Sequence, residues 1–572
     1  MIPSAWIRSR PRRSRTLPLL ALFSLACSHP ATPPSPPADL ATQGAPGLHA
    51  IDPARIETTT KYLSSDDLAG RGVGTPGGAR AEDYVAEAFT KIGLLPAGER
   101  GTYFQTVPFR EATLDAASTS LVIHHGGSDT PLVQGEGAMI RPFPRSTDVA
   151  IDAPLVFAGY GISRPDLGYD DLAGLDVRGA IVVVYAGAPR TIGGKEVPST
   201  LHAVLGDSGV RNRLLLALGA RAVLSIWDPI RSKKMSLADL AKRLPPTSMA
   251  WLANGVPESD PVLPGALLDE ASIEHLFATA SDSHPLRDLW TALDRGEPRR
   301  ASLNATASLR IRSQHHDLAA RNVAASLPGS DPALKAETVV YTAHLDHLGV
   351  GAPVNGDAIY NGALDDAVGV AGILEIARAF AALPTRPRRS TLFLAVTAEE
   401  RGLLGSDYFA AHPTVPLDRL VADINIDGLN PLFGSTDIVA LGVEHSTLAK
   451  NVAEAARATG YGLSPDEEPE EAYFIRSDQY SFVKRGIPSL FPNAGLRDAH
   501  GDKAANRAIA DAWSKDHYHR PSDVWRPEYN AAWAAHEAGF DFLLGLSVSM
   551  ADEKPHWNPR DVFEQQKGQK DR

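Results

Sequence analysis

Two histidines and an aspartate stand close together at the end of one apolar run. The stretch VVYTAHLDHLG begins like a buried strand at Val339 and then places His344, Asp346 and His347 before Gly349. Imidazole and carboxylate groups in such a cluster suit a metal site or proton transfer. The alternative is a strand with a polar edge, and segments elsewhere in the chain must decide between the two.

Four further segments carry carboxylates or histidines. They are NGALDDAVG with Asp365 and Asp366, TAEERG with Glu399 and Glu400, ADINIDGLN with Asp427, and KDHYHRPSD with His517 and His519. Singly, each residue has an ordinary explanation as a helix cap, a turn residue or a surface histidine. Such segments meeting at one edge of a sheet would instead indicate a functional site.

The polar segments lie in a part of the chain where expected strands and helices alternate. The expected strands are Asn322–Leu327, Thr338–Thr342, Thr391–Thr397, Leu420–Ile426 and Pro488–Phe491, and the clearest helix is Asp366–Leu383. This alternation predicts an α/β fold with a mixed, largely parallel sheet covered by helices on both faces. In such sheets ligands bind beyond the carboxyl ends of the strands, which is where the polar segments lie.

The donor types at this edge favour zinc. Cys27 is the only cysteine, and mixed imidazole and carboxylate ligands suit zinc better than manganese or cobalt. One zinc ion needs about three protein ligands, and this edge offers more. Two ions about 3.5–4 Å apart that share a carboxylate would use them all and would activate a water for attack on a carbonyl. An unligated carboxylate would take the proton from that water.

The segments also carry a resemblance to a known family. In their order, AHLDHLG, NGALDDAVG, TAEERGLLGS, INID and YHRPSD resemble the secreted co-catalytic zinc aminopeptidases, relatives of glutamate carboxypeptidase II and the transferrin receptor. RSDQYSFVKRGIPSLF and KYLSSDDLAGRGVGTPG are similar to that family as well, so that the resemblance covers nearly all of residues 51–545. It implies a fold of the zinc exopeptidase type and hydrolysis of N-terminal residues from peptide substrates.

The resemblance implies a ligand set. It implies two Zn²⁺ ions per chain that share Asp365 as a bridge. His344 and Asp427 would bind one ion, and Glu400 and His519 would bind the other.

The resemblance also implies two supporting roles. Glu399 would be the general base and later the acid, and Asp346 would orient His344 by accepting its other ring proton. His347 and His517 match no ligand position, which favours places beside the ligands or in the pocket.

Three positions depart from the common pattern of the family. Leu364 and Asp366 flank the implied bridge where many relatives carry Asp and Asn, and Gln479 stands where His is frequent. None of them removes an implied ligand, so the departures bear on substrate preference.

Composition divides the chain further. The expected parts are a lipoprotein-type signal peptide at 1–27, a Pro/Ala-rich linker at 28–48, the N-terminal part of the peptidase domain at 49–131, a β-rich insert at 132–304, the catalytic domain at 305–550 and a polar tail at 551–572. The insert, with FAGYGI and YDDLAGLDVRGAIVVV, is similar to the protease-associated domain inserted in many members of that family.

The first residues carry a targeting signal. Basic residues, an apolar run from Leu17 to Ala26 and then Cys27 predict export with a possible lipid anchor at Cys27. The product would be an outer-membrane or periplasmic lipoprotein. An ordinary leader with a chance cysteine is the alternative and would give a secreted protein.

Charge and motifs limit the other functions. The net charge of −12 argues against a nucleic-acid partner. Gly72, Gly74 and Gly77 match G-x-G-x-x-G but follow an expected helix, so a turn between helices is the better interpretation. The acidic run DEEPEE, residues 466–471, is either a solvated loop or a site for a substrate amine.

The leading hypothesis is a zinc-dependent aminopeptidase. A carboxypeptidase or dipeptidase on the same scaffold would need a cation for the substrate carboxylate, for which Arg476 and Lys484 are candidates. A non-catalytic, receptor-like binding module and a single-zinc cyclase are the remaining alternatives. Oligomeric state cannot be inferred from the residues.

Overall fold

The computed structural model describes residues 39–243, 245–281 and 283–564. The predicted signal peptide, with Cys27, lies outside these residues. Among the helices described, none is long and apolar enough to cross a membrane.

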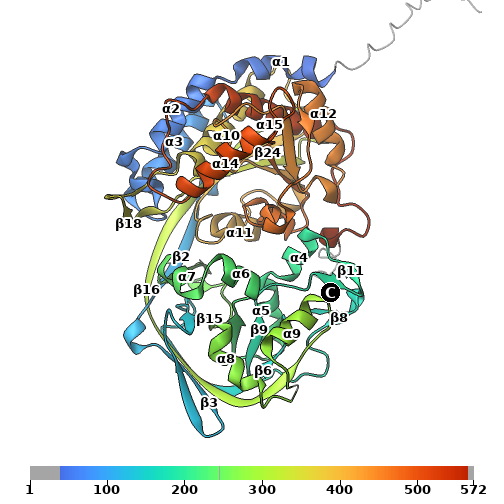
Figure 1. The fold of residues 1–572 in the computed structure, drawn as a ribbon. Coiled ribbons are helices and arrows are strands. Elements are labelled where there is room, and N and C mark those ends of the chain that lie inside the picture. The colour runs from blue at the N-terminus through green and yellow to red at the C-terminus, as the bar shows by residue number, and fades with distance from the viewer. Residues whose placement is uncertain (1–38, 244, 282, 565–572) are drawn as a thin grey trace, which may run out of the picture. The chain divides into compact units, whose positions relative to one another are not determined.

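The predicted sheet is present and is largely parallel at its centre. Figure 1 shows helices packed around the strands of this part of the molecule. Its four neighbouring parallel strands are β20 (Ser390–Val396), β17 (Thr338–His344), β21 (Leu420–Asn425) and β24 (Ser489–Ala494). Antiparallel strands flank them: β16 (Ala301–Leu327), then β2 (Phe104–Leu114) and β13 (Thr247–Ala253) on one side, and β22 (Asp437–Leu441) on the other. The short strands β1 (Leu95–Pro96) and β23 (Gly462–Leu463) pair with β16 and β22. The predicted fold class is therefore confirmed.

Helices cover both faces of this sheet because its central strands are apolar on both sides. In β17, Val339 and Tyr341 join the core that contains α10, whereas Val340 joins a second cluster with Phe409 of α11 and Phe482 of α13. The helices on the first face are α2 (Pro53–Leu63), α3 (Pro76–Ile92), α10 (Val368–Ala381), α12 (Ala449–Thr459) and α15 (Ala531–Met550). The second face carries α11 (Leu404–Ala411) and α13 (Gln479–Val483).

Helix α10 begins later than the sequence predicts. Asp365 and Asp366 lie in the preceding turn, Ala363–Ala367, with extended or non-helical backbone angles. Their side chains are thereby available to the sheet edge instead of capping the helix.

Part of the predicted linker is a helix. Residues Leu40–Ala50 form α1, which contacts α10 and α15. Gly44 and Gly47 allow this close approach, since a Cβ there would lie 2.2 Å from Leu543 Cδ2 and 2.3 Å from Phe542 Cζ. The prediction of an extended linker is therefore wrong for residues 40–48, because contact through glycine leaves no periodic apolar pattern to read.

The predicted insert forms a second sheet with its own core. Its strand order is β4 (Ser128–Leu132), β3 (Ser120–His125), β16, β6 (Asp148–Phe157), β9 (Ile181–Tyr185), β12 (Ala222–Ile226), β15 (Gly265–Leu268) and β5 (Ala138–Ile140). Helices α4 (Ser199–Leu205), α5 (Ser208–Ala217), α6 (Pro229–Lys234), α7 (Leu237–Arg243), α8 (Glu270–Phe277) and α9 (Leu286–Asp294) belong to the same stretch of chain. The core draws on residues from Leu114 to Ile311, beyond both ends of the predicted range 132–304. Strand β16 belongs to both sheets and joins them.

The C-terminal segment is polar in composition but contacts the body of the protein through apolar side chains. Trp557 and Phe563 are buried beside Phe474 and Tyr480, so residues up to 563 are packed onto the body of the protein. The expectation of a polar tail is therefore wrong for this part, because two aromatic side chains suffice to anchor it.

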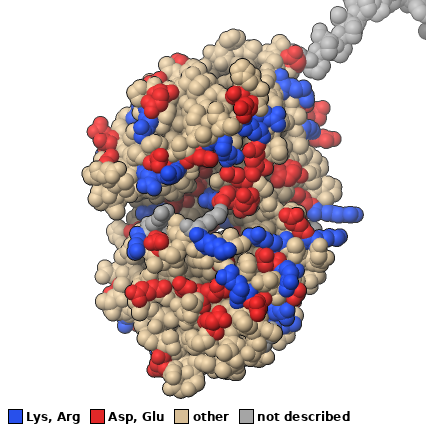
Figure 2. All heavy atoms as spheres, viewed as in Figure 1, with Lys and Arg blue, Asp and Glu red and all other residues tan. Residues whose placement is uncertain are grey.

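The glycine-rich segment before α3 forms the turn that the sequence predicts. Gly72 and Gly74 lie in a turn between the short helix Asp66–Arg71 and α3, and Gly77 lies in the first turn of α3. Acidic and basic side chains are interspersed on the face of the molecule in Figure 2.

Candidate metal centre

The predicted ligands meet at the carboxyl ends of the parallel strands. His344 is the last residue of β17, Glu400 follows β20, Asp427 follows β21, Asp365 lies in the turn before α10, and His519 follows α14 (Ala504–Asp516). Parallel strands end at the same edge, and this brings residues far apart in the sequence to one place.

Asp365 lies between the two histidines. Its Oδ1 is 3.1 Å from His344 Nε2, and its Oδ2 is 3.1 Å from His519 Nε2. On either side, Asp427 Oδ1 is 3.4 Å from His344 Nε2 and Glu400 Oε2 is 3.2 Å from His519 Nε2. The structure thus brings the five predicted residues into two groups that share Asp365, as a bridging carboxylate requires. Their role as ligands stays a prediction.

Asp427 is held by the RSDQ segment. Ser477 Oγ donates to Asp427 Oδ2 over 2.5 Å, and Asn425 Nδ2 donates to Ser477 Oγ over 2.9 Å. Gln479, a departure from the family pattern, accepts the other hydrogen of the Asn425 amide at 2.8 Å. This network leaves Asp427 Oδ1 directed toward His344.

The Glu399–Glu400 pair lies in a turn beyond β20. The backbone carbonyl of Glu399 accepts from the N–H groups of Gly402 and Leu403, both at 2.8 Å. Among the described residues, no hydrogen bond or ion pair engages the Glu399 carboxylate. Burial is the largest effect that raises the pKa of Glu399, and the negative charge of Glu400 adds to it. Glu399 thus presents a carboxyl group beside the site that is not engaged by another described residue.

The side chain of Asp346 makes other contacts than the sequence predicts. His344 Nδ1 lies 3.1 Å from the backbone carbonyl of Asp346, not from its carboxylate. The carboxylate instead accepts the backbone N–H groups of Glu399 at 3.0 Å and Glu400 at 3.4 Å. The expectation that its side chain orients His344 is wrong, because the ring faces the main-chain oxygen and the carboxylate is occupied by the turn after β20.

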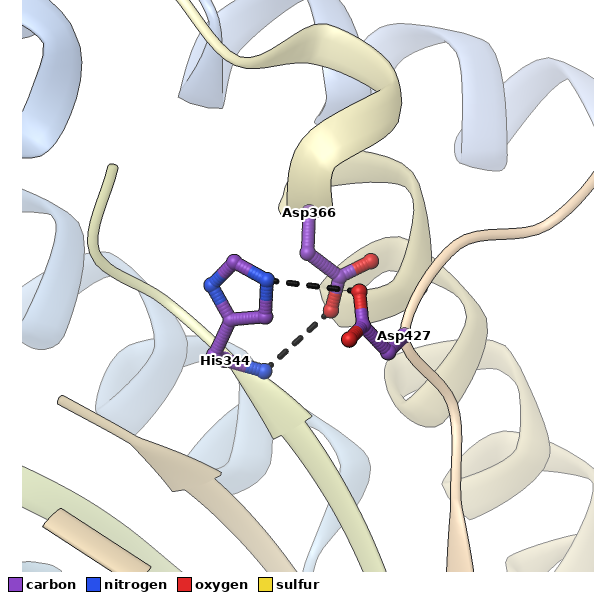
Figure 3. A group of neighbouring side chains, drawn as sticks. All are labelled: His344, Asp366 and Asp427. Carbon is purple, nitrogen blue, oxygen red and sulfur yellow. Dashed lines mark hydrogen bonds and ion pairs between the residues drawn. The ribbon is translucent and has the colours of Figure 1, made fainter. Parts of the chain in front are cut away.

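Asp366 also lies beside His344 and Asp427, as Figure 3 shows. Its carboxylate is already occupied by backbone N–H groups, from Gly428 at 2.7 Å, Gly369 at 3.0 Å and His344 at 3.2 Å. A carboxylate that accepts several N–H bonds has little capacity left for a cation. Asp366 therefore ties the ends of β17 and β21 to the start of α10.

Sequence reasoning missed two residues that hold the bridge segment. The Asp523 carboxylate accepts the N–H groups of Leu364 at 3.0 Å and Asp365 at 3.2 Å. Arg71 is buried and donates to four backbone carbonyls, those of Leu63, Leu345, Asn361 and Gly362. Their signals were present in YHRPSD and in the glycine-rich turn, but nothing in the sequence showed which segments they reach.

The two unassigned histidines lie in different places. His347 is buried with Nδ1 2.7 Å from Glu400 Oε1. His517 contacts Ser522 Oγ at 2.9 Å and Arg526 Nη2 at 3.3 Å instead. Only His347 is in contact with a predicted ligand.

The residues present fit a metal pair. Buried Asp365 Oδ2, Glu400 Oε1 and both ring nitrogens of His347 have no hydrogen-bond partner among the described residues. Buried polar atoms without partners are costly, and a cation between them removes that cost. Although burial opposes it, the nearby histidines lower the pKa of Glu400 to about 2, so its carboxylate is ionised. Imidazole and carboxylate donors in this number suit zinc.

A known protein family matches the part of the chain that contains this site. Residues 322–542 match the model of Peptidase family M28. This part of the chain is similar to the domain of that family, here called the M28 domain. It contains all the residues of the two groups and ends within α15.

Relatives of the M28 domain are distant. A protein of Pyrenophora teres f. teres, described as a probable zinc metalloprotease, is 31% identical over 228 residues, which are 35% of this chain and 46% of that protein. The chain thus spans about half the length of this curated relative. Among solved structures, an aminopeptidase from Aneurinibacillus sp. strain AM-1 has a TM-score of 0.48 at 18% identity. The match covers 91% of this chain and 98% of the aminopeptidase chain. A zinc aminopeptidase from Bacillus subtilis has a TM-score of 0.40 at 17% identity, with 88% and 99% covered.

Proposed function

We propose that the M28 domain makes this protein a zinc-dependent aminopeptidase. The observation that carries the proposal is the position of Asp365, whose two oxygens are each 3.1 Å from a different histidine. His344 and Asp427 would hold one ion, Glu400 and His519 the other, with Asp365 shared. When bound, the zinc ions would polarise the scissile carbonyl and make a water acidic enough to attack it.

The residues of the chain would carry the proton. Glu399 would accept a proton from the attacking water at its unengaged carboxylate and pass it to the nitrogen of the leaving amine. Asp346 would keep Glu399 in place through its backbone N–H. Ser477 would hold Asp427 in place beside His344, so that both side chains could bind the ion on their side of Asp365.

The contacts of two cations favour an aminopeptidase over a carboxypeptidase or dipeptidase. Arg476 lies 3.5 Å from Glu471 Oε2, and its guanidinium covers the ring of Tyr473. Lys484 lies 3.4 Å from Asp407 Oδ1. Both candidates for binding a substrate carboxylate are therefore engaged within the protein.

A substrate amine would have acidic groups near the metals. Glu399 and Asp427 lie at the centre itself, whereas Glu467 in the DEEPEE run pairs with Lys503 and Arg507. Two carboxylates of the run, Glu467 and Glu468, are thus paired with Lys503 and Arg507, and the amine would be recognised at the metal centre.

The test combines metal content with cleavage of free and N-acetylated aminoacyl substrates. We expect release only from substrates with a free amine. Glu399→Gln should retain metal and lose turnover by orders of magnitude, because it removes the proton carrier and no predicted ligand. The exposed Glu470→Gln is the matched control. Rapid cleavage of blocked substrates would refute the aminopeptidase, and full activity of Glu399→Gln would refute its role.

We also propose export and a protease-associated insert. Export with a lipid anchor rests on the sequence around Cys27, and Cys27→Ser should abolish incorporation of labelled fatty acid. A protein that stays unlabelled before this substitution is secreted or periplasmic without an anchor.

The insert reaches the M28 domain through Asp207, whose Oδ2 accepts from Tyr480 at 3.1 Å.

A further inference from the structure

His347 is the one buried histidine of the site to which no role has been given. Its side chain has no exposed surface, and Nδ1 lies 2.7 Å from Glu400 Oε1 and 3.9 Å from Asp365 Oδ2. A Cβ on Gly362 would lie 2.5 Å from His347 Cγ, so the glycine gives the ring its place. The ring is therefore fixed with one nitrogen against the Glu400 side of the site.

The contact with Glu400 is short but lacks the angles of a good hydrogen bond. Neither His347 Nδ1 nor Glu400 Oε1 has a hydrogen-bond partner among the described residues, although 2.7 Å separates them. A buried imidazole whose nitrogens both lack partners is costly, which calls for another explanation. Two atoms that bind one ion fit this pattern, because donors about 2.0–2.2 Å from a zinc ion lie roughly 3 Å from each other.

His519 shows the same relationship on the other side of the group. Its Nε2 is 3.1 Å from Asp365 Oδ2 and 3.2 Å from Glu400 Oε2. One atom from each of His347, Asp365 and Glu400 lies within 4.8 Å of the others. The two imidazole rings are 5.8 Å apart between centroids and inclined at 67° to each other. Both rings therefore border the same pair of carboxylates.

We propose that His347 is a further ligand of the ion held by Glu400 and His519. The inference rests on the metal pair of the proposed function and extends it. The Glu400 ion then has two imidazoles, Glu400 and a share of Asp365, whereas the other ion has one imidazole, Asp427 and a share of Asp365. The two positions would then differ in their donors, with one more imidazole at the Glu400 position.

The competing role for His347 is that of a donor that orients Glu400. A donor role needs a hydrogen on Nδ1, and a ligand role needs a lone pair there. Aspartate supplies an oxygen ligand without a donor, and asparagine supplies an amide donor at nearly the same place. His347→Asp and His347→Asn therefore separate the two roles, and His347→Leu removes both.

The experiment titrates full-length, metal-free protein with Zn²⁺ and counts bound ions. Wild type should bind two ions, and His347→Leu should weaken one of them by about 10-fold or more. His347→Asp should bind that ion better than His347→Asn does. His517→Leu, a histidine outside the group, is the control and should match wild type. Unchanged binding by His347→Leu, or better binding by His347→Asn, overturns the proposal.

A second measurement needs no variant. X-ray absorption of the two-zinc wild-type protein should show three imidazoles shared by two ions. Two imidazoles would overturn the His347 proposal and leave the metal pair intact. Wild-type protein that binds no zinc would instead refute the proposed function.

Discussion

The carboxylate of Asp346 holds the backbone N–H of Glu399 at 3.0 Å. This contact links the end of β17 to the turn that carries the proposed base. Asp346→Ala should lower kcat about 10- to 100-fold, because the turn loses its acceptor. Metal content should stay near normal, since the carbonyl that faces His344 belongs to the backbone.

Asp346→Asn provides the comparison for this prediction. The amide keeps one oxygen for the N–H of Glu399, so kcat should fall less than in Asp346→Ala. Steady-state kinetics and metal analysis on the same preparations test both variants. Loss of the His344 ion in Asp346→Ala would show that the side chain acts on the ligand after all.

Removal of Asp365 should affect both ions at once. Its two oxygens lie against His344 and His519, so Asp365→Ala should weaken both ions, whereas Asp427→Ala should weaken one. Ligand binding stabilises a folded protein by about 2.7 kcal/mol at 100 times Kd, so a chelator should lower the melting temperature of wild type. In Asp365→Ala the chelator should lower the melting temperature much less than in wild type. A large chelator effect in this variant would contradict the bridge.

Arg71 should be essential to the site without touching it. Arg71→Met leaves buried carbonyls of Asn361, Gly362 and Leu345 without their donor, which should lower the free energy of unfolding by about 3 kcal/mol or more. Metal affinity should fall as well, since these carbonyls belong to the segments of His344 and Asp365. Denaturant unfolding and zinc titration test this, with the exposed Arg80→Met as control. Wild-type stability would show that water replaces the guanidinium.

Glu537 should make the protein more stable at low pH than at high pH. Burial raises the pKa of Glu537 from near 4.5 to about 7. The folded state therefore binds more protons than the unfolded state between these values, and its stability falls as pH rises through this window. Glu537→Gln stays neutral, and its amide oxygen can still accept the N–H of Asn430, now at 2.8 Å.

The advantage of Glu537→Gln over wild type should therefore grow between pH 4.5 and 7 and then stay constant. Its upper limit is about 3 kcal/mol, from 1.36 kcal/mol per pKa unit. Denaturant unfolding at pH 5 and pH 8 measures the difference, with the exposed Glu528→Gln as control. A difference that is equal at both pH values would mean that Glu537 is ionised in the folded protein throughout.

Much of the fold was predictable because its signals are local. The apolar runs of β17, β20 and β21 and the stripe of α10 show their elements directly, and parallel strands place their carboxyl ends together. The choice of His344, Asp365, Glu400, Asp427 and His519 followed from polar residues at those ends and from the family resemblance. Helix α1 was missed because glycine contacts give no pattern.

Tertiary structure alone decided where each side chain of the site points and which residue it contacts. The sequence shows that Asp346 follows His344, but only the folded chain shows that its carboxylate reaches Glu399 and that its carbonyl faces the ring. Likewise VVYTAHLDHLG contains two histidines of equal chemistry, and only the packing against Gly362 aims His347 at Glu400. Spacing along a strand determines which residues reach an edge, whereas the partner of each side chain depends on segments far away in the sequence.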